Sequence, residues 1–335
     1  MSCRSVARSD RDDGLLSLKW YCMATVCEIR VQREPGAESL ALDAINEVRR
    51  IESKYSRYRN DSAISAINQS AGKAAVRCDP ETMALLQFAS HMFRLSDGLF
   101  DLTSGILRNV WRFHRSAQPQ GSCAKQNSSG HSAGVAPPSD HSAGGDQIPP
   151  ARAEVDRLLP YIGWHRVELT DSNIRLPLAG MELDFGGIGK EYAADRARQI
   201  LYAGGIRSAM VDLGGDLSLL GSKPDGSPWT LAIRDPRATD KILATLPMQS
   251  GALATSGDYE RCIVHKGIRY CHILNPKTGW PCQYWRSVSV AAGSCLLCGA
   301  LASIAMLKER EAIAFLKQQK ASWLCVGPDG LIYRG

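Results

Sequence analysis

The chain has 335 residues, of which 44% are hydrophobic, so it can bury a substantial core in one large domain or two small ones. Its net charge of +6 is spread along the sequence without a long Lys/Arg run, which argues against a nucleic-acid partner. The 11 cysteines lie at irregular spacings with a single C-x-x-C, so they form no zinc motif and favour a reducing compartment.

The N-terminal sequence does not have the pattern of an export signal. Residues 1–22 contain three acids and lack the apolar run of a secretory signal, and no segment reaches the roughly 18 apolar residues that span a bilayer. As written, the sequence predicts a cytoplasmic location and no transmembrane segment, whereas a different translation start would allow a periplasmic one. We expect residues 1–17 to be flexible and residues 18–335 to form one domain.

The first half of this domain is predicted to contain a strand and two helices. Alternating apolar and polar residues over 20–32 indicate the strand. Apolar residues follow helical spacing from Ala41 to Ile51, and a second helix is expected over 81–95, before Ser96-Asp97-Gly98. Residues 115–150 are rich in Ser, Gly, Ala and Pro and repeat His-Ser-Ala-Gly, so we expect a disordered insertion.

The second half is predicted to be rich in strands. A strand over 180–184 leads through a glycine-rich turn into a helix that ends at Gly204-Gly205, and short strands follow up to residue 293. Helices over 294–307 and 309–318 precede a final hairpin. Because strands and helices occur in runs rather than in strict alternation, we expect an α+β fold.

Several stretches have both a functional and a structural explanation. The glycine-rich turn from Asp184 to Lys190 suits a phosphate at a helix N-terminus, but its spacing matches no nucleotide fingerprint, so a tight turn explains it equally well. Residues 212–216 and 254–261 combine small residues with carboxylates or hydroxyls, which fits a flat ligand or, more commonly, bulges and turns. A lone histidine such as His272 is more often structural than catalytic.

The order of these stretches resembles one enzyme family. The series comprises Met23-Ala24-Thr25, Ser56-Arg57-Tyr58, Leu99-Phe100-Asp101, residues 184–195, Leu213-Gly214-Gly215-Asp216, residues 254–261 and residues 272–279. Over about 20–310, apart from the insertion, this series resembles the ApbE family of FAD:protein FMN transferases. The resemblance implies a single α+β domain with mixed or antiparallel sheets that binds FAD in a cleft. It also implies Mg²⁺-dependent transfer of FMN to a Thr or Ser hydroxyl of an acceptor flavoprotein, with release of AMP.

The resemblance assigns roles to individual residues. His272 corresponds to the family histidine near the reacting phosphate and is the predicted catalytic residue. The predicted FAD-binding residues are Met23, Tyr58, Leu99, Phe100, Asp101, Asp184, Lys190 and Ile273. Their chemistry fits these roles, because aromatic and thioether groups pack on flat rings, Asp101 can accept from ring or ribose donors, and Lys190 can face phosphate.

The predicted metal position departs from the family pattern. In the family, the helix at 298–303 reads Ala-Asp-Ala-Leu-Ala-Thr, and its Asp and Thr reach Mg²⁺ together with a backbone carbonyl. Here Gly299 stands in place of the Asp, Ser303 keeps a hydroxyl, and Gly187 would supply the carbonyl. Because Mg²⁺ usually takes one or two carboxylates, we expect weaker metal binding that is coupled to FAD. Asp216 and Asp258 are candidates to compensate.

The missing carboxylate leaves three functional hypotheses. The first is an active flavin transferase, the second a catalytically weak or inactive FAD-binding protein, and the third a slow FAD hydrolase that yields FMN and AMP. The same helix carries the C-x-x-C pair, Cys295 and Cys298. On an apolar helix such a pair is more typical of core packing than of a redox or metal site.

Overall fold

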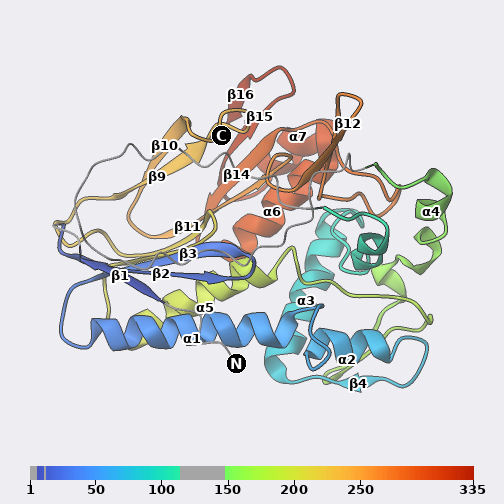
Figure 1. Cartoon of the computed structure of the whole chain (residues 1–335), viewed down its shortest axis with the longest axis horizontal. Coiled ribbons are helices and arrows are strands. Elements are labelled where there is room, and N and C mark those ends of the chain that lie inside the picture. Colours follow the sequence, from blue (N-terminus) through green and yellow to red (C-terminus); the bar gives the residue numbers. More distant parts are fainter. Residues whose placement is uncertain (1–5, 11–12, 114–147) are drawn as a thin grey trace, which may run out of the picture.

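The computed structural model describes residues 6–10, 13–113 and 148–335. The predicted disordered insertion, residues 115–150, lies outside the described residues except for 148–150. The described residues form the predicted α+β fold, which is built around one large antiparallel sheet. Figure 1 shows the arrangement of its helices and strands.

Within the described residues the main sheet has nine strands, and every neighbouring pair is antiparallel. In spatial order they are β1 (Ala7–Asp10), β2 (Leu15–Cys22), β3 (Thr25–Gln32), β7 (Ala209–Leu213), β8 (Asp216–Leu220), β11 (Gly251–Gly257), β14 (Ser287–Ala292), β15 (Ser322–Val326) and β16 (Ile332–Arg334). The chain leaves this sheet after β3, forms a mainly helical region, and returns at β7, which pairs with β3.

Three small sheets surround the main one. They consist of β9 (Trp229–Arg234) with β10 (Ile242–Met248), β12 (Cys262–His265) with β13 (Ile268–Cys271), and β4 (Val76–Arg77), β6 (Asn173–Arg175) and β5 (Glu168–Leu169). β9 alternates strictly between buried and exposed side chains, as expected for a strand with one face on a core.

Along the sequence, the helices occur mainly between β3 and β7 and after β14. The α-helices among the described residues are α1 (Ala37–Tyr55), α2 (Ala63–Gln69), α3 (Pro80–Leu95), α4 (Arg152–Asp156), α5 (Gly189–Ala203), α6 (Cys295–Lys308) and α7 (Ala312–Lys317). Short 3-10 helices are η1 (Gly105–Asn109), η2 (Leu159–Tyr161), η3 (Trp164–Arg166) and η4 (Glu309–Glu311). The helices predicted over 41–51 and 81–95 are confirmed as α1 and α3, and Asp79 caps α3 by accepting from the Thr82 N–H.

The main sheet separates two apolar clusters. On one face, Leu16 and Ile29 belong to a core that also contains Ile45 of α1 and residues of α5 and α6. On the other face, Leu15 packs in a second cluster with Trp229 of β9. Figure 1 shows α1 and α5 on one side of the sheet and the β9–β10 pair on the other. The sheet is therefore the middle layer of the fold, with helices on one face and a hairpin on the other.

Two expectations about individual segments are wrong. Residues 15–17 are not flexible but begin β2 and are buried, and residues 7–10 pair with β2 as β1. The predicted strand over 180–184 is reduced to one bridge between Glu182 and Ser104, because Asn68 Oδ1 accepts from the Leu183 N–H in place of a neighbouring strand. Residues 242–248, which were not singled out as a strand, form β10 and pair with β9.

Candidate active site

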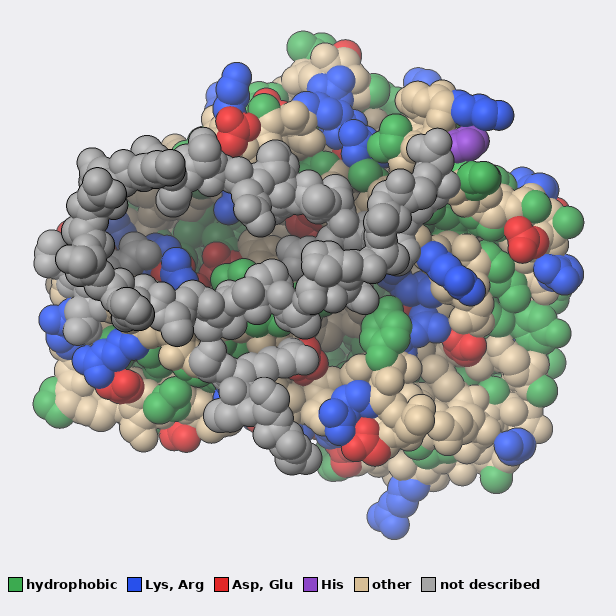
Figure 2. Space-filling model, viewed as in Figure 1, with side chains coloured by type: hydrophobic (Ala, Val, Ile, Leu, Met, Phe, Trp, Pro, Cys, Tyr) green, Lys and Arg blue, Asp and Glu red, His purple; other side chains and the backbone are tan. Residues whose placement is uncertain are grey.

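A cleft of about 1200 Å³ is lined by residues of the β2–β3 turn, α1, β9, β11, the start of α5 and the segment after β13. Ligand pockets commonly measure roughly 300–1,000 Å³, so this cleft has room for a dinucleotide. Figure 2 shows a hollow on the face turned towards the viewer, in which apolar, acidic and basic side chains are visible together. A ligand with a flat apolar part and charged groups would match such walls.

The predicted site residues converge on this cleft. Its lining includes Met23, Tyr58, Leu99, Phe100, Asp101, Asp184, Gly187, Lys190, His272, Ile273 and Ser303. Gly299 is the exception, because it is buried within α6 and does not line the cleft. The predicted residues that line the cleft come from six separate stretches of sequence, and the one that does not line it is at the position where the chain departs from the family pattern.

Met23 is presented by a strained turn between β2 and β3. Met23 and Ala24 both have left-handed backbone conformations, with φ of 50° and 57°, which non-glycine residues rarely adopt. The Glu52 carboxylate of α1 holds the turn by accepting hydrogen bonds from the Met23 N–H and the Cys22 thiol. Strain of this kind persists where the surrounding structure fixes the backbone, often at ligand sites. Here it directs a thioether side chain to the cleft.

Aromatic side chains line one part of the cleft. Tyr58 is 83% exposed, although most of its surface is apolar, and the Arg57 guanidinium lies 6.0 Å from the centre of its ring. Phe100 is buried and lies close to Gly187, where an added Cβ would be 3.9 Å from the ring. An exposed tyrosine beside a cleft can stack on a flat ring system, which fits its predicted role.

The Asp101 carboxylate accepts hydrogen bonds from neighbouring protein groups. Its Oδ1 accepts from the Thr103 N–H at 2.8 Å and the Thr103 hydroxyl at 2.6 Å, and its Oδ2 accepts from the Trp164 N–H at 2.9 Å. Burial raises its pKa, although these hydrogen bonds oppose the shift. Asp101 therefore connects η3 to the wall of the cleft, and these contacts make it a positioning residue.

Asp184 belongs to a group of paired charges, here called the arginine–carboxylate group: Arg57, Arg108, Glu182 and Asp184. Asp184 Oδ2 accepts from Arg108 at 2.9 Å and from Arg57 at 3.3 Å, and Arg57 also donates to Glu182 at 2.7 Å. Burial would raise the pKa of Asp184, but the two guanidinium groups outweigh burial and hold the pKa below its usual value. Each of these side chains has an opposite charge beside it.

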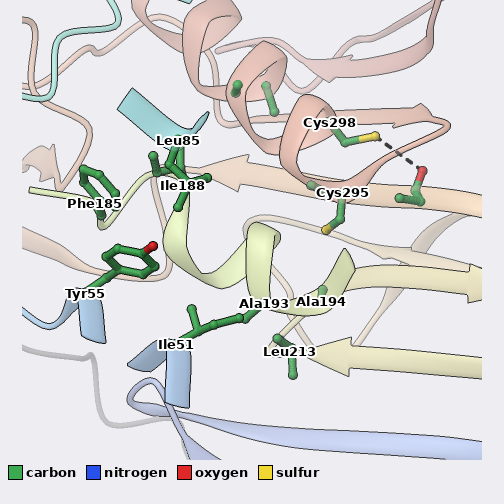
Figure 3. Packing of buried hydrophobic residues seen from close by; sticks show 14 of the residues in the cluster. Ile51, Tyr55, Leu85, Phe185, Ile188, Ala193, Ala194, Leu213, Cys295 and Cys298 are labelled. Carbon is green, nitrogen blue, oxygen red and sulfur yellow. Dashed lines mark hydrogen bonds between the residues drawn. The ribbon is translucent and has the colours of Figure 1, made fainter. Parts of the chain in front are cut away.

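The glycine-rich turn places the N-terminus of α5 at the cleft. Phe185 stacks on Tyr55 of α1 with ring centres 5.2 Å apart, which anchors the turn to the helical layer (Figure 3). No side chain caps α5, and Gly186, Gly187 and Gly189 line the cleft. Lys190 adds a cation whose ammonium lies 2.7 Å from Asp216 Oδ2. These features suit a phosphate group, so the functional explanation of the turn gains support over the purely structural one.

His272 follows β13 and has an unused ring nitrogen. Its backbone N–H donates to the Arg261 carbonyl at 3.0 Å, whereas its buried Nδ1 has no hydrogen-bond partner among the described residues. Burial, with the nearby charges of Arg108, Arg261 and Lys190, lowers the pKa of His272 to about 3. The imidazole is therefore neutral near pH 7 and able to accept a proton. A bound diphosphate would raise this pKa, because negative charge favours imidazolium.

The comparison with known proteins identifies the family. The ApbE family model matches residues 23–325. The chain belongs to the ApbE family. It is similar to the FAD:protein FMN transferase of Treponema pallidum, with 31% identity over 314 residues that cover 86% of this chain and 80% of that protein. The FAD:protein FMN transferase of Vibrio cholerae is 26% identical over 295 residues, with the same two coverages. The crystal structure of the ApbE protein from Thermotoga maritima has 28% identity and a TM-score of 0.80, and the match covers 96% of this chain and 97% of that one.

This ApbE protein has an unexpected side chain beside Gly299. A Cβ atom added at Gly299 would lie 2.6 Å from Cγ and 2.9 Å from Oε1 of Glu191, which is on the first turn of α5. Glu191 lines the cleft and is 8% exposed, and its Oε2 has no hydrogen-bond partner among the described residues. Burial and the neighbouring Asp216 raise the pKa of Glu191 to about 8. The sequence analysis missed Glu191, although a glutamate directly after Lys190 was visible there.

The two aspartates suggested as compensating carboxylates are both engaged. Both carboxylate oxygens of Asp258 accept from Arg237 at 2.6 Å, and Asp258 does not line the cleft. Asp216 lines the cleft but is paired with Lys190. Among the described residues, no group of three or more His, Cys, Asp or Glu side chains is arranged around a common metal position. A cation here would therefore depend on ligands from the substrate, a hydroxyl and the backbone as well as a carboxylate.

The ambiguous glycine and cysteine motifs have structural roles in this ApbE fold. Gly214 and Gly215 form the β7–β8 turn with φ of 71° and 98°, which only glycine adopts easily. Cys295 and Cys298 are fully buried, Cys298 Sγ donates to the Ala252 carbonyl at 3.5 Å, and their side chains point in different directions (Figure 3). Core packing is confirmed for the C-x-x-C pair. No helix in the described part of the chain has the length and apolar character to cross a bilayer.

Proposed function

We infer that this protein is an FAD:protein FMN transferase, which moves FMN from FAD to a Thr or Ser hydroxyl of an acceptor flavoprotein and releases AMP. The observation that carries this conclusion is the cleft itself. Eleven of the 12 residues assigned from the ApbE resemblance line one cavity, to which the N-terminus of α5 also belongs; one of the eleven, His272, has a ring nitrogen without a hydrogen-bond partner in the described part of the chain. Family membership and the names of the relatives support the same activity.

The chemistry requires one bond to form and one to break at the FMN phosphorus. The acceptor hydroxyl oxygen attacks this phosphorus, a new P–O ester bond forms, and the P–O bond to AMP breaks. The hydroxyl loses its proton, and AMP leaves with the bridging oxygen. Phosphoryl transfer depends mainly on positioning the reacting groups and on stabilising negative charge on the phosphate oxygens. The residues of this cleft are suited to both.

The residues of the cleft divide these tasks. The neutral imidazole of His272 is suited to accept the hydroxyl proton, since its Nδ1 has no other partner among the described residues. Lys190 and the α5 N-terminus are suited to the diphosphate. Met23 and Tyr58 offer a thioether and an aromatic surface for the flat rings of FAD.

We propose Mg²⁺ as the metal that assists this transfer. The proposed donors are hard oxygens, as Mg²⁺ prefers: the Gly187 carbonyl, the Ser303 hydroxyl and the diphosphate. Glu191 also lines the cleft, and its Oε2 has no hydrogen-bond partner within the described ranges. When bound, such a cation would neutralise charge that develops on the phosphoryl oxygens. The residues present therefore fit the group, even though Gly299 carries no side chain.

The deciding experiment is transfer of FMN to a protein. Purified enzyme is incubated with FAD, Mg²⁺ and candidate acceptor domains, and the acceptors are weighed by mass spectrometry while the nucleotides are separated by chromatography. We expect one FMN added per acceptor and an equal amount of AMP. FMN and AMP without a modified acceptor would indicate FAD hydrolysis, and FAD binding without either product would indicate an inactive flavin-binding protein.

A further inference from the structure

We propose that Glu191 provides the carboxylate for a divalent cation in the cleft, in place of the side chain that Gly299 lacks. The carboxylate has moved from α6 to the facing turn of α5, and the glycine makes room for it. This inference deepens the proposed function and rests on it, because the cation would serve the diphosphate of the same substrate. It assigns a ligand that neither the ApbE resemblance nor the order of motifs indicated.

Steric complementarity between the two positions is the first argument. An added Cβ at Gly299 would lie 2.6 Å from Glu191 Cγ, 2.9 Å from Oε1 and 3.0 Å from Cδ. Real side chains do not approach so closely, so a residue other than glycine at 299 and the observed Glu191 conformation exclude each other. The Glu191 side chain therefore fills the volume in which a carboxylate attached to position 299 would begin.

The state of the Glu191 carboxylate is the second argument. Its Oε2 is buried without a hydrogen-bond partner among the described residues, and Glu191 is one of the residues that line the cleft. The neighbouring cation, Lys190, lies 2.7 Å from Asp216, which engages that charge. Buried carboxylate oxygens are normally hydrogen-bonded, paired or bound to a metal, so this oxygen has the properties of a ligand atom.

The position of Ser303 is the third argument. Ser303 lies four residues after Gly299, so both are on one face of α6, about 6 Å apart along its axis. Ser303 lines the cleft, and its hydroxyl is 3.1 Å from that of Ser256 at the end of β11. Glu191 lies beside position 299, so its carboxylate is about one helical turn of α6 from Ser303. Gly187 lines the cleft from the turn that precedes α5.

Metal affinity measured directly tests this assignment without relying on activity. Mn²⁺ serves as a probe for Mg²⁺, and its free fraction is followed by electron paramagnetic resonance in the presence of saturating FAD, with FAD alone as the blank. We expect Glu191→Gln, which keeps the size and removes the oxygen that can ionise to bind a cation, to weaken Mn²⁺ binding about tenfold or more, since even outer-shell changes cost this much. FAD affinity without metal, followed by flavin fluorescence, should stay near that of the wild type.

Glu47→Gln is the matched control. Glu47 lies on α1 outside the cleft lining, where it pairs with Arg50 at 2.7 Å and Arg196 at 3.2 Å. The same chemical change there should leave Mn²⁺ affinity unaltered. Wild-type affinity in Glu191→Gln, or no Mn²⁺ binding by the wild-type FAD complex, would overturn the proposal.

An exchange of the two residues provides an independent test. Gly299→Asp alone should not strengthen metal binding, because its new side chain collides with Glu191 and places two carboxylates together. The double variant Glu191→Gly, Gly299→Asp should recover Mn²⁺ affinity to within a few-fold of the wild type. A gain in affinity from Gly299→Asp alone would contradict the proposal, and the Glu191→Gln measurement decides the matter if the exchanged variants do not fold.

The transfer assay separates this inference from the proposed function. If the wild type transfers FMN and Glu191→Gln binds Mn²⁺ normally, the ligand assignment fails and the proposed function stands. If Glu191→Gln loses Mn²⁺ affinity and the wild type modifies no acceptor, the cation site stands and the proposed function fails.

Discussion

Two groups of charged residues in the same cleft differ in how completely they are satisfied. In the arginine–carboxylate group, Asp184 accepts from Arg57, Arg108 and the Gly186 N–H, and its pKa is held below the usual value. The second group, here called the open group, comprises Lys190, Glu191, Asp216 and His272. In the open group, Glu191 Oε2 and His272 Nδ1 are buried without hydrogen-bond partners among the described residues.

The difference separates residues that stabilise the cleft from residues that keep an atom able to bind a ligand or a proton. A carboxylate whose charge is matched by two guanidinium groups contributes to folding and has little capacity for a further ligand. A buried oxygen or ring nitrogen without a partner costs stability, and it persists where a ligand or a proton uses it. We therefore expect substitutions in the arginine–carboxylate group to reduce stability, and substitutions of Glu191 and His272 in the open group to reduce binding or turnover.

The largest effect is expected for His272→Ala. Removing a proton acceptor from phosphoryl transfer should lower the rate of FMN transfer about 10²- to 10⁴-fold, with little change in FAD affinity. Mass spectrometry of the acceptor gives the rate, and flavin fluorescence gives the affinity. A loss of affinity equal to the loss of rate would place His272 among the binding residues instead.

The next effect concerns stability and the arginine–carboxylate group. Asp184→Asn leaves the largely buried Arg108 without its charge partner and Arg57 with Glu182 alone, so the free energy of unfolding should fall by about 3 kcal/mol. Asp97→Asn is the matched control, because Asp97 pairs with Lys308 while 77% exposed, and it should change stability little. Urea denaturation measures both, and equal effects would remove the distinction between the two settings.

The sequence predicted the local elements of the fold and part of each charged group, namely Asp184 in the first and Lys190 and His272 in the second. The spacing of Ala41, Ile45 and Val48 indicated α1 because helical periodicity is local, and all three are buried as expected. Residues of the cleft were found through the order of motifs, and the structure brings Asp184 and Lys190 together with His272.

The remaining features depend on contacts that the order of residues does not reveal. Glu191 and Gly299 are in contact because α5 packs on α6. Nothing in the order of residues therefore linked the missing carboxylate at position 299 to the glutamate at position 191. Asp101 was predicted to bind FAD, yet its oxygens accept from Thr103 and Trp164, and the latter contact joins segments far apart in the sequence.

A smaller effect should appear in the pH dependence of stability. The pKa of His272 is lowered from its usual 6.5 to about 3 in the folded protein, so between these values only the unfolded chain takes up the proton. Stability should therefore fall by about 1 kcal/mol per pH unit as the pH drops below about 6.5. His272→Asn should flatten this slope in urea denaturation near pH 7 and pH 5. An unchanged slope would mean that other groups produce it.

The smallest effect is expected for Glu191→Gln, whose stability we consider here without metal. It tests most directly whether the two charged groups differ. Glutamine keeps the volume beside Gly299 and removes a buried carboxylate whose Oε2 has no partner among the described residues, so no stabilising contact of that oxygen is lost. The free energy of unfolding should stay within about 1 kcal/mol of the wild type or rise slightly, whereas Asp184→Asn lowers it. Thermal melts of both variants in the presence of a chelator provide the measurement. If the two variants were equally destabilised, Glu191 would be a structural carboxylate like Asp184, and the open group would lose the property that defines it.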